Sequence, residues 1–269
     1  MSDPVLLTPL LARVRVLARE AGRAILDTRM DADSVQNKDD GSPVTRADLA
    51  AERVILEGLE ALRPRFPIVS EESDCERVAA ASATTYWLVD PLDGTKEFVK
   101  GLPEYTVNIA LIHAGEPVLG VIHVPPVDRL FEATRGSGAR CYDRDTVRTL
   151  APRPVAAPQR AVVSRSHLSP ETERLLDALG IRERLPSGSS LKMCAVAEGT
   201  ADVYPRLGPT RLWDTAAGTA IAREAGCAVV DLAGQPLRYD LAAGLTHSGF
   251  LVCAPGTCLD ACVRALTPA

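Results

Sequence analysis

Aromatic side chains are scarce in this chain, at 4% of its 269 residues. Proteins that stack nucleic-acid bases or sugar rings depend on such side chains, so surfaces of that kind are not expected. Positive charge is not in excess either, because 30 Lys and Arg face 35 Asp and Glu, for a formal net charge of −5. Nucleic acid or an anionic membrane would favour a basic surface, so neither is expected as the main partner. A small anion can still bind an acidic protein if metal ions supply the positive charge.

The cysteines form no recognisable metal motif. None of the seven belongs to a C-x-x-C pair, and no His lies near Cys258 and Cys262 to complete a zinc set. We therefore expect reduced cysteines, packed in the core of a cytosolic protein. No apolar run reaches the roughly 18 residues of a membrane span, and Asp3 stands where a signal peptide would carry Lys or Arg. The expected protein is soluble and cytoplasmic.

The first part of the sequence predicts two helices ahead of any strand. Thr8 and Pro9 are typical of a helix start, as N-cap and first-turn residue. Apolar residues then recur at helical spacing up to Ile25, which indicates an amphipathic helix. Thr45 and Asp48 have the spacing of a capping box, which predicts the start of the second helix.

Strand patterns dominate the next part of the chain. Residues 67–142 contain short apolar and β-branched runs joined by turns, which predict a meander of mostly antiparallel strands. The proline-rich stretch 151–159 has no periodicity and predicts a boundary, after which strands and helices alternate. The sequence thus predicts an α/β (α+β layered) fold of two lobes, residues 1–150 and 151–269, in which helices cover mixed sheets.

The most informative segment is DPLDGTKEF, residues 90–98. An apolar strand leads into Asp90, and Pro91 is expected to end its ladder and preset a turn. Asp93 can then point the same way as Asp90, and Gly94 allows a turn or a close approach of the backbone to a ligand. Thr95 can begin a helical turn whose free N–H groups face an anion. Two carboxylates beside such N–H groups suit Mg²⁺ and phosphate together.

More acidic residues occupy similar positions elsewhere. Glu71 and Glu72 follow an apolar strand, Asp214 opens a helix, and Asp48 lies behind a polar loop. Carboxylates brought together would repel one another unless divalent cations lay among them. Ligands that are all oxygen favour Mg²⁺, Mn²⁺ or Ca²⁺ over zinc. We therefore interpret these acids as candidate ligands of one metal site.

Each of these acids also has an ordinary structural interpretation. Asp48 can serve only the capping box, and Asp214 can be only an N-cap. Glu71 and Glu72 together are typical of a solvated loop, and a D-x-x-D pair alone is a weak signal. Their joint occurrence at strand ends and helix starts favours the metal site. The hypothesis requires that the acids meet in space.

Two other features are interpreted as structural. The G-S-G at residues 136–138 is similar to part of a phosphate-binding loop, but Cys141 replaces the third glycine of G-x-G-x-x-G. We expect a hairpin turn there. Trp87 and Trp213, each close to a candidate ligand, are expected to pack in the core or beside the site.

Four segments give the chain a specific resemblance to a known family, the inositol-monophosphatase superfamily of lithium-sensitive phosphatases. The segments are KDDGSPVTRAD (38–48), SEES (70–73), DPLDGTKEF (90–98) and WDTAAGTAIAREAGC (213–227). The resemblance extends from about residue 10 to residue 253. It implies a sugar-phosphatase-like αβαβα sandwich, with most metal ligands in the first lobe, and the last ligand and the nucleotide contacts in the second.

Other segments resemble one branch of that superfamily, the bacterial CysQ-type 3′(2′),5′-bisphosphate nucleotidases. Lys96 and Glu97 follow DGT, where inositol phosphatases usually continue with Thr-Asn-Phe. The same branch is indicated by SRSH (164–167), GSSLK (188–192), AEG (197–199) and YPRLGPT (204–210).

The resemblance implies a metal site. Glu71, Asp90 and the Leu92 carbonyl would bind metal ions, with Asp90 bridging two of them, and Asp93 and Asp214 would complete the second site. The ions implied are two or three Mg²⁺, for which Mn²⁺ could substitute.

The resemblance also implies the residues of catalysis. Thr95 and Asp48 would pair to orient and deprotonate the attacking water, and Glu72 would support the metal ligands. The backbone N–H groups of Gly94 and Thr95 would bind the scissile phosphate, and Lys38 would lie near the metal loop.

Four residues of the second lobe would contact the nucleotide and its second phosphate: Ser166, His167, Gly188 and Lys192. Without the resemblance, His167 would be an ordinary loop histidine and Lys192 a solvated helix lysine. The residues expected to contact the substrate are therefore Glu71, Leu92, Asp93, Gly94, Thr95, Ser166, His167, Gly188, Lys192 and Asp214.

The activity implied is Mg²⁺-dependent hydrolysis of the 3′-phosphate of adenosine 3′,5′-bisphosphate to AMP and phosphate, in sulfur assimilation. The 3′-phosphoadenylyl sulfate is a second candidate substrate. The alternatives are an inositol monophosphatase or other sugar phosphatase of the same superfamily, and a non-catalytic protein that binds metal or nucleotide. A monomer and a homodimer both stay open, as does association with the inner face of the cell membrane.

Overall fold

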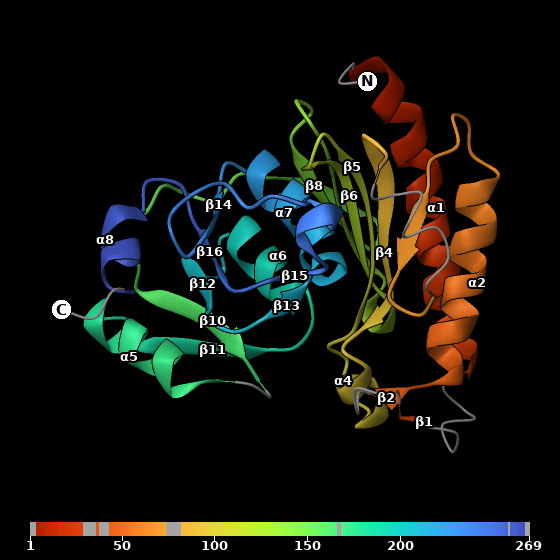
Figure 1. Ribbon diagram of the computed structural model, residues 1–269. Helices are drawn as coiled ribbons and strands as arrows, with labels where there is room; N and C mark the ends of the chain where they lie inside the picture. The colour runs from red at the N-terminus through yellow and green to blue at the C-terminus, as the bar shows by residue number, and fades with distance from the viewer. Residues whose placement is uncertain are drawn as a thin grey trace.

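Two large β-sheets alternate with layers of helices through the molecule (Figure 1). The computed structural model describes residues 4–28, 36–37, 43–73, 82–165, 168–257 and 259–266. From one side to the other, the layers are α1 (Pro4–Thr28) with α2 (Arg46–Glu60), a seven-stranded sheet, α6 (Leu191–Ala197) with α7 (Leu212–Glu224), a five-stranded sheet, and α5 (Pro170–Ala178) with α8 (Leu259–Arg264). This αβαβα sandwich confirms the predicted fold class.

Helix α1 begins at Pro4, so the predicted start at Thr8 and Pro9 is wrong. Pro9 lies inside the helix, where its missing N–H removes one backbone hydrogen bond. The turn before Pro9 stays helical because Leu7, which lies in that turn, packs in the apolar cluster under α1 and α2 and is 1% exposed. Burial of that side chain outweighs the lost hydrogen bond.

The seven-stranded sheet is covered on both faces. In spatial order its strands are β3 (Ile68–Ser70), β4 (Thr85–Asp93), β5 (Thr106–His113), β6 (Glu116–Val124), β7 (Arg129–Thr134), β8 (Ala139–Asp143) and β9 (Thr146–Leu150). Strands β3 and β4 are parallel, and the other neighbouring pairs are antiparallel. Along β5, Ile109 and Leu111 join the apolar cluster under α1 and α2, whereas Ala110 and Ile112 join the cluster around α6 and α7. This period of two distributes the apolar residues over both faces.

Helix α7 packs directly on this sheet. A side chain at Gly120 of β6 would meet the Ala217 carbonyl at 2.5 Å, so the close approach requires glycine there. The apolar cluster around α6 and α7 contains residues of both large sheets, such as Leu88 and Val252. The first sheet ends at Leu150 and the second begins at Arg160, and the division into lobes at residue 150 stays a prediction.

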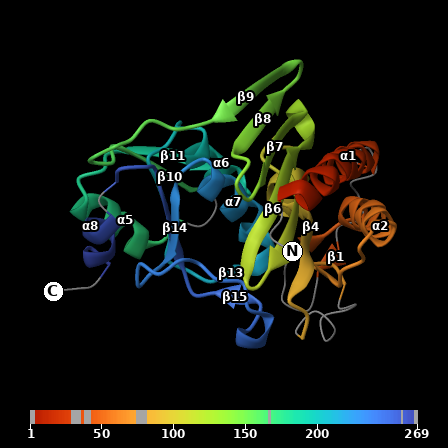
Figure 2. The same ribbon diagram turned by 90° about the horizontal axis from the view of Figure 1, so that it is seen from above.

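The five-stranded sheet lies between α6–α7 and α5–α8 (Figure 2). In spatial order its strands are β11 (Glu183–Ser187), β10 (Arg160–Ser164), β12 (Val203–Arg206), β16 (Phe250–Cys253) and β14 (Ala228–Asp231). Strand β10 is parallel to both β11 and β12, and β16 is antiparallel to both β12 and β14. Leu175 of α5 and Cys262 of α8 pack on the outer face of this sheet.

The remaining elements are short: β1 (Gln36–Asn37), β2 (Pro43–Val44), α4 (Thr95–Val99), η2 (Pro125–Val127), β13 (Thr210–Arg211), η3 (Leu241–Ala243) and β15 (Thr246–His247). Strand β1 pairs with β2, and β13 pairs with β15. None of the helices in the described part of the chain has the length and apolar character that a bilayer span needs.

The structure confirms several packing predictions. Trp87 and Trp213 are both buried. Five cysteines are free and buried: Cys141, Cys194, Cys227, Cys253 and Cys262. The other two, Cys75 and Cys258, lie outside the described residues.

Candidate active site

A cavity of about 330 Å³ lies where the two large sheets and the central helices meet. Its walls come from the ends of β3 and β4, from α4, from the starts of α6 and α7, and from β12 and β13. The chain segments that build it are far apart in sequence, from Glu71 to Phe250. The cavity contains most of the residues predicted from the sequence.

The strand that leads into the cavity does not end where the sequence predicts. Strand β4 continues through Pro91 to Asp93, so the expectation that Pro91 ends the ladder is wrong. Its pairing with β5 instead shifts register between Asp90 and Asp93. A bulge accommodates proline, which has no N–H to donate to the ladder. Both aspartates line the cavity as predicted.

Gly94 turns the chain from β4 into α4. Its φ of 94° lies in the left-handed region, which favours glycine. A side chain there would also lie 2.8 Å from the backbone oxygen of Glu104. Thr95 follows as the first residue of α4 and lines the cavity together with Gly94.

Three of the predicted metal ligands converge. Glu71, Asp90 and Asp214 each place one carboxylate oxygen within 4.8 Å of those of the other two. Asp90 Oδ1 accepts a hydrogen bond from the Leu92 N–H at 3.0 Å. Asp90 Oδ2 is buried, and it has no hydrogen-bond partner among the described residues. A buried carboxylate oxygen without a donor is costly unless a cation occupies its free side.

The pKa shifts of these carboxylates also favour a bound cation. Burial raises the pKa of Asp90 well above its usual range, and the neighbouring charges of Glu71, Asp93 and Asp214 raise it further. Burial likewise raises the pKa of Asp214, and Asp93 and Glu71 add to that increase. The cause is like-charge repulsion in a site shielded from water. A divalent cation would relieve the repulsion.

Asp93, the fourth predicted acidic ligand, is held by two residues that were not predicted from the sequence. Ser190 Oγ donates to Asp93 Oδ2 at 2.7 Å or to the Asp214 carbonyl at 2.8 Å, and Asn108 Nδ2 donates to Ser190 Oγ at 2.8 Å. Ser190 lies in the quoted segment GSSLK, which was a usable signal. Asn108 could be found only from the register that pairs it with Asp90.

The two carboxylate oxygens of Asp48 have different partners, Thr45 at the start of α2 and Thr95 at the start of α4. Its Oδ2 accepts from the Thr45 N–H at 2.8 Å and completes the predicted capping box at the start of α2. Its Oδ1 lies 3.2 Å from Thr95 Oγ1, which can donate to it or to the Leu92 carbonyl at 3.1 Å. Burial raises the pKa of Asp48, against the effect of its hydrogen bonds with Thr45. The structural and the catalytic interpretations are therefore compatible.

Asp214 lies in the first turn of α7, and the N-cap residue is Arg211. The alternative interpretation of Asp214 as an N-cap is therefore wrong. Glu72 follows Glu71 but does not line the cavity, and its charge contributes to the raised pKa of Asp90.

The lining of the cavity also includes basic residues. Lys192 is 9% exposed, which excludes a solvated lysine, and its Nζ donates to the Ser189 carbonyl. Burial lowers the pKa of Lys192, against the opposing effect of Asp93. Arg206 and Arg211 line the same cavity, and neither was predicted as a site residue. Gly188 is there as predicted. Lys38, Ser166 and His167 lie outside the described residues.

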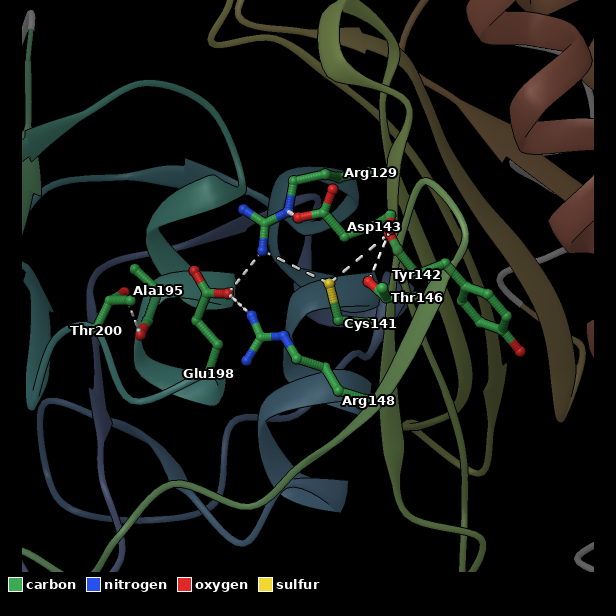
Figure 3. Close-up of polar contacts among 9 residues, drawn as sticks. All are labelled: Arg129, Cys141, Tyr142, Asp143, Thr146, Arg148, Ala195, Glu198 and Thr200. Carbon is green, nitrogen blue, oxygen red and sulfur yellow. Dashed lines mark hydrogen bonds and ion pairs between the residues drawn. The ribbon is translucent and has the colours of Figure 1, made fainter.

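The far end of α6 is tied to the first sheet (Figure 3). Glu198, the C-cap residue of α6, accepts hydrogen bonds from Arg129 at 2.8 Å and from Arg148. Arg129 lies on β7 and Arg148 on β9. Because α6 begins beside Ser190 and carries Lys192, this anchor fixes the helix that brings both residues to the cavity.

The glycine pair at residues 136 and 138 forms the predicted hairpin turn, between β7 and β8. Glu224 accepts hydrogen bonds from the N–H groups of Gly136 at 3.0 Å and Gly138 at 2.9 Å. A carboxylate of the chain itself therefore occupies the donors that a phosphate would need.

The described donors of the acidic cluster fit a hard divalent cation. They are carboxylate oxygens, and Leu92 lines the same cavity. Neither sulfur nor imidazole belongs to the cluster within the described residues. The buried Asp90 Oδ2 supplies an acceptor for which the described part of the chain offers no hydrogen-bond donor.

Known proteins resemble this chain over most of its length. The model of the inositol monophosphatase family matches residues 7–260. The 3′(2′),5′-bisphosphate nucleotidase CysQ of Shigella flexneri is 46% identical over 248 residues, which cover 90% of this chain and 99% of that protein. The crystal structure of CysQ from Bacteroides thetaiotaomicron has a TM-score of 0.75 at 43% identity, covering 88% of this chain and 94% of that chain.

A more distant structure has the same fold. The extragenic suppressor protein SuhB of Bartonella henselae has a TM-score of 0.81 at 28% identity, and the match covers 97% of this chain and 99% of that chain. The family match spans far more than half of the sequence, and it includes every described carboxylate of the cavity. The chain belongs to the inositol monophosphatase family.

Proposed function

We propose that this protein is a Mg²⁺-dependent 3′(2′),5′-bisphosphate nucleotidase that hydrolyses the 3′-phosphate of adenosine 3′,5′-bisphosphate to AMP and phosphate. The observation that carries the proposal is a single cavity lined by both acidic residues (the acidic wall: Glu71, Asp90, Asp93 and Asp214) and basic residues (the basic wall: Lys192, Arg206 and Arg211). A substrate with two phosphates suits both walls. The name of the curated CysQ relatives, 3′(2′),5′-bisphosphate nucleotidase, supports the same assignment.

The acidic wall would hold the metal ions. The ligands proposed are Glu71, Asp90, Asp93, Asp214 and the Leu92 carbonyl, for two or three Mg²⁺ with Mn²⁺ as a substitute. Metal ions bound there would neutralise charge on the scissile phosphate and lower the pKa of water. Glu72 would add negative charge behind these ligands.

The residues of the chain would position the reacting water. When Thr95 Oγ1 donates its hydrogen to Asp48 Oδ1, its lone pairs stay free to accept a hydrogen bond from a water in the cavity. Asp48 has a raised pKa, which makes it a better proton acceptor than an ordinary aspartate. A proton of the water would pass through Thr95 Oγ1 to Asp48 as the water oxygen bonds to phosphorus. The bond to the ribose 3′-oxygen would break, and that oxygen would take up a proton from solvent. The backbone N–H groups of Gly94 and Thr95 would bind the phosphate oxygens.

The basic wall would bind the rest of the substrate. Lys192 and Arg206 bring positive charge to the cavity, and Arg211 adds a further cation. Arginine and lysine side chains are the usual partners of phosphate groups. We assign the second phosphate to this wall, with Gly188, Ser166 and His167 as further nucleotide contacts. Lys38 would lie close to the metal loop.

We also propose a metabolic role for the reaction. The reaction would recycle a by-product of sulfur assimilation in the cytoplasm, and 3′-phosphoadenylyl sulfate would be a second substrate. The oligomeric state, monomer or homodimer, is a separate question that light scattering answers.

A substrate panel tests the function. Phosphate release is measured with Mg²⁺, and again with excess EDTA, for adenosine 3′,5′-bisphosphate, 3′-phosphoadenylyl sulfate, inositol 1-phosphate and fructose 1,6-bisphosphate. We expect the two nucleotides to have the highest kcat/KM, and EDTA to abolish turnover of all four. A preference for inositol 1-phosphate would instead assign the inositol phosphatase activity. No turnover of any compound would favour a binding protein.

A further inference from the structure

An ion pair connects the catalytic loop side of the cavity to its nucleotide side. Glu104 lies in the segment between α4 and β5, and Arg165 follows β10. Arg165 Nε donates to Glu104 Oε2 at 2.8 Å, and Arg165 Nη2 donates to Glu104 Oε1 at 2.6 Å. Glu104 Oε2 also accepts from the Gly188 N–H at 2.9 Å. One carboxylate thus joins three chain segments.

The backbone of Glu104 fits between two glycines of the cavity. A Cβ on Gly94 would lie 2.8 Å from the Glu104 carbonyl oxygen, and a Cβ on Gly188 would lie 2.9 Å from the same oxygen. Gly94 belongs to the loop proposed to bind the scissile phosphate. Gly188 belongs to the part of the cavity lining proposed to contact the nucleotide, which we call the nucleotide wall. Residue 104 therefore sets the spacing between these two walls.

Arg165 is itself held in place. Its Nη2 donates to the Pro186 carbonyl at 3.1 Å, and its backbone N–H donates to the Ser187 carbonyl at 3.1 Å. In the sequence it directly precedes Ser166 and His167, two of the proposed nucleotide contacts. The guanidinium of Arg165 lowers the pKa of Glu104, which keeps the carboxylate charged.

Exposed ion pairs usually contribute little to stability, but geometry distinguishes this one. The two hydrogen bonds are parallel and charge-assisted, which fixes the orientation of both side chains. The pair also joins segments 61 residues apart in sequence, next to Ser164 and Gly188, which line the cavity. Its contribution is therefore expected in substrate positioning more than in folding.

We propose that the Glu104–Arg165 pair determines substrate affinity by holding the nucleotide wall at a fixed distance from the phosphate-binding loop. The two residues are positioning residues and do not contact the reacting atoms. The proposal rests on the proposed function, since it assumes a substrate that spans both walls. Loss of the pair would loosen the nucleotide wall and leave the metal ligands unchanged.

Steady-state kinetics of Arg165→Met and Glu104→Gln test the proposal, with adenosine 3′,5′-bisphosphate at saturating Mg²⁺. We expect KM to rise about tenfold, equivalent to about 1.4 kcal/mol of binding free energy, with kcat within about twofold of wild type. The double variant should have the same KM as either single variant, because each single substitution already removes the same ion pair. Arg238→Met is the control. Arg238 Nη1 lies 2.6 Å from Glu116 Oε1 in another surface ion pair, and neither residue lines the cavity.

Two results would overturn the proposal: a KM that matches the Arg238→Met control, or a fall in kcat without a rise in KM. Thermal unfolding of each variant shows that the chain is folded during the assay. The wild-type substrate panel tests the function separately. If the wild type prefers another phosphate ester of the panel, the same variants are assayed with that ester, so failure of one proposal is distinguishable from failure of the other.

Discussion

Two groups of buried carboxylates in this protein differ in their partners. Glu132 is 1% exposed, and Arg15 binds it with two hydrogen bonds, at 2.6 and 2.7 Å. Asp202 is 3% exposed, and it accepts from the Arg160 guanidinium at 2.6 Å and from two backbone N–H groups. Asp90 is equally buried, but among the described residues its Oδ2 has no donor.

The pKa values of Asp202 and Asp90 shift in opposite directions. Burial acts to raise the pKa of Asp202, but Arg160 and the backbone N–H groups of Gln159 and Arg160 outweigh it and lower the pKa. At Asp90 the burial and the neighbouring carboxylates all raise the pKa. The chain therefore pairs Glu132 and Asp202 with arginine, whereas Asp90 Oδ2 has no hydrogen-bond donor among the described residues.

Removing one acid of the cavity should have the largest effect. We expect Asp90→Asn to lower kcat roughly 1,000-fold, because one metal ligand and its charge are lost. In EDTA the same variant should unfold at a higher temperature than wild type, since the substitution relieves repulsion. Phosphate release and thermal unfolding measure the two effects. Wild-type turnover by the folded variant would reject Asp90 as a ligand.

Asp93→Asn is a second test of the acidic wall. It removes one ligand charge but keeps the side-chain oxygen that can accept from Ser190. Turnover should be abolished while the far-UV circular dichroism spectrum stays that of the wild type. Wild-type phosphate release would show that Asp93 has no catalytic role.

The same substitution at a structural acid should do the opposite. Asp202→Asn weakens the bonds with Arg160 and two backbone N–H groups, so we expect a loss of about 2 kcal/mol of stability. For a chain of this size that lowers Tm by about 5 °C. The kcat of the folded protein should not change, because Asp202 lies outside the active-site cavity. A loss of kcat with unchanged Tm would abolish the distinction between the two groups of acids.

A smaller effect is expected on the basic wall. Arg206→Gln should raise KM for adenosine 3′,5′-bisphosphate about tenfold and change kcat little, because the residue would bind the phosphate that does not react. The effect should be weaker for a substrate with one phosphate. An equal rise in KM for inositol 1-phosphate would remove the assignment of Arg206 to the second phosphate.

The pH dependence of stability in EDTA gives the finest comparison. Asp90 has a raised pKa in the folded protein. Its stabilising contribution to the free energy of unfolding is therefore present below pH 3.8, its ordinary pKa, and is lost as the pH rises through the raised pKa. Asp202 has a lowered pKa in the folded protein, so its stabilising contribution is present above pH 3.8 and is lost as the pH falls through the lowered pKa.

Thermal unfolding over a pH series should reveal these opposite signs. The Tm advantage of Asp90→Asn over wild type should grow from acidic to alkaline pH and vanish when Mg²⁺ replaces EDTA. The Tm deficit of Asp202→Asn should be constant in the neutral range and shrink in acid. Parallel curves for the two variants would contradict the opposite pKa shifts.

The sequence predicts the part of the site that is local. Asp90, Asp93, Gly94 and Thr95 lie within one short segment, where turn chemistry and residue type indicate their direction. The convergence of Asp90 and Asp214 depends on the stacking of layers, which the family resemblance supplied and periodicity could not. Ser190 and Arg206 were not predicted as site residues, because their partners are fixed only by tertiary packing.

Strand prediction failed where strands are polar. Strand β11 has the sequence ERLPS, with no alternation and an internal proline, and it exists as an edge strand through its parallel pairing with β10. Strand β9 is largely exposed and lies at one edge of the seven-stranded sheet. Edge strands bury few side chains, so their sequences carry little apolar signal.

Anomalous diffraction from crystals soaked in MnCl₂ tests the metal site most directly. We predict at least one strong manganese peak among the carboxylates of Glu71, Asp90 and Asp214, with Asp90 Oδ2 as a ligand, and its loss in Asp90→Asn crystals. Wild-type crystals with manganese bound elsewhere and no peak in this cluster would contradict the assignment.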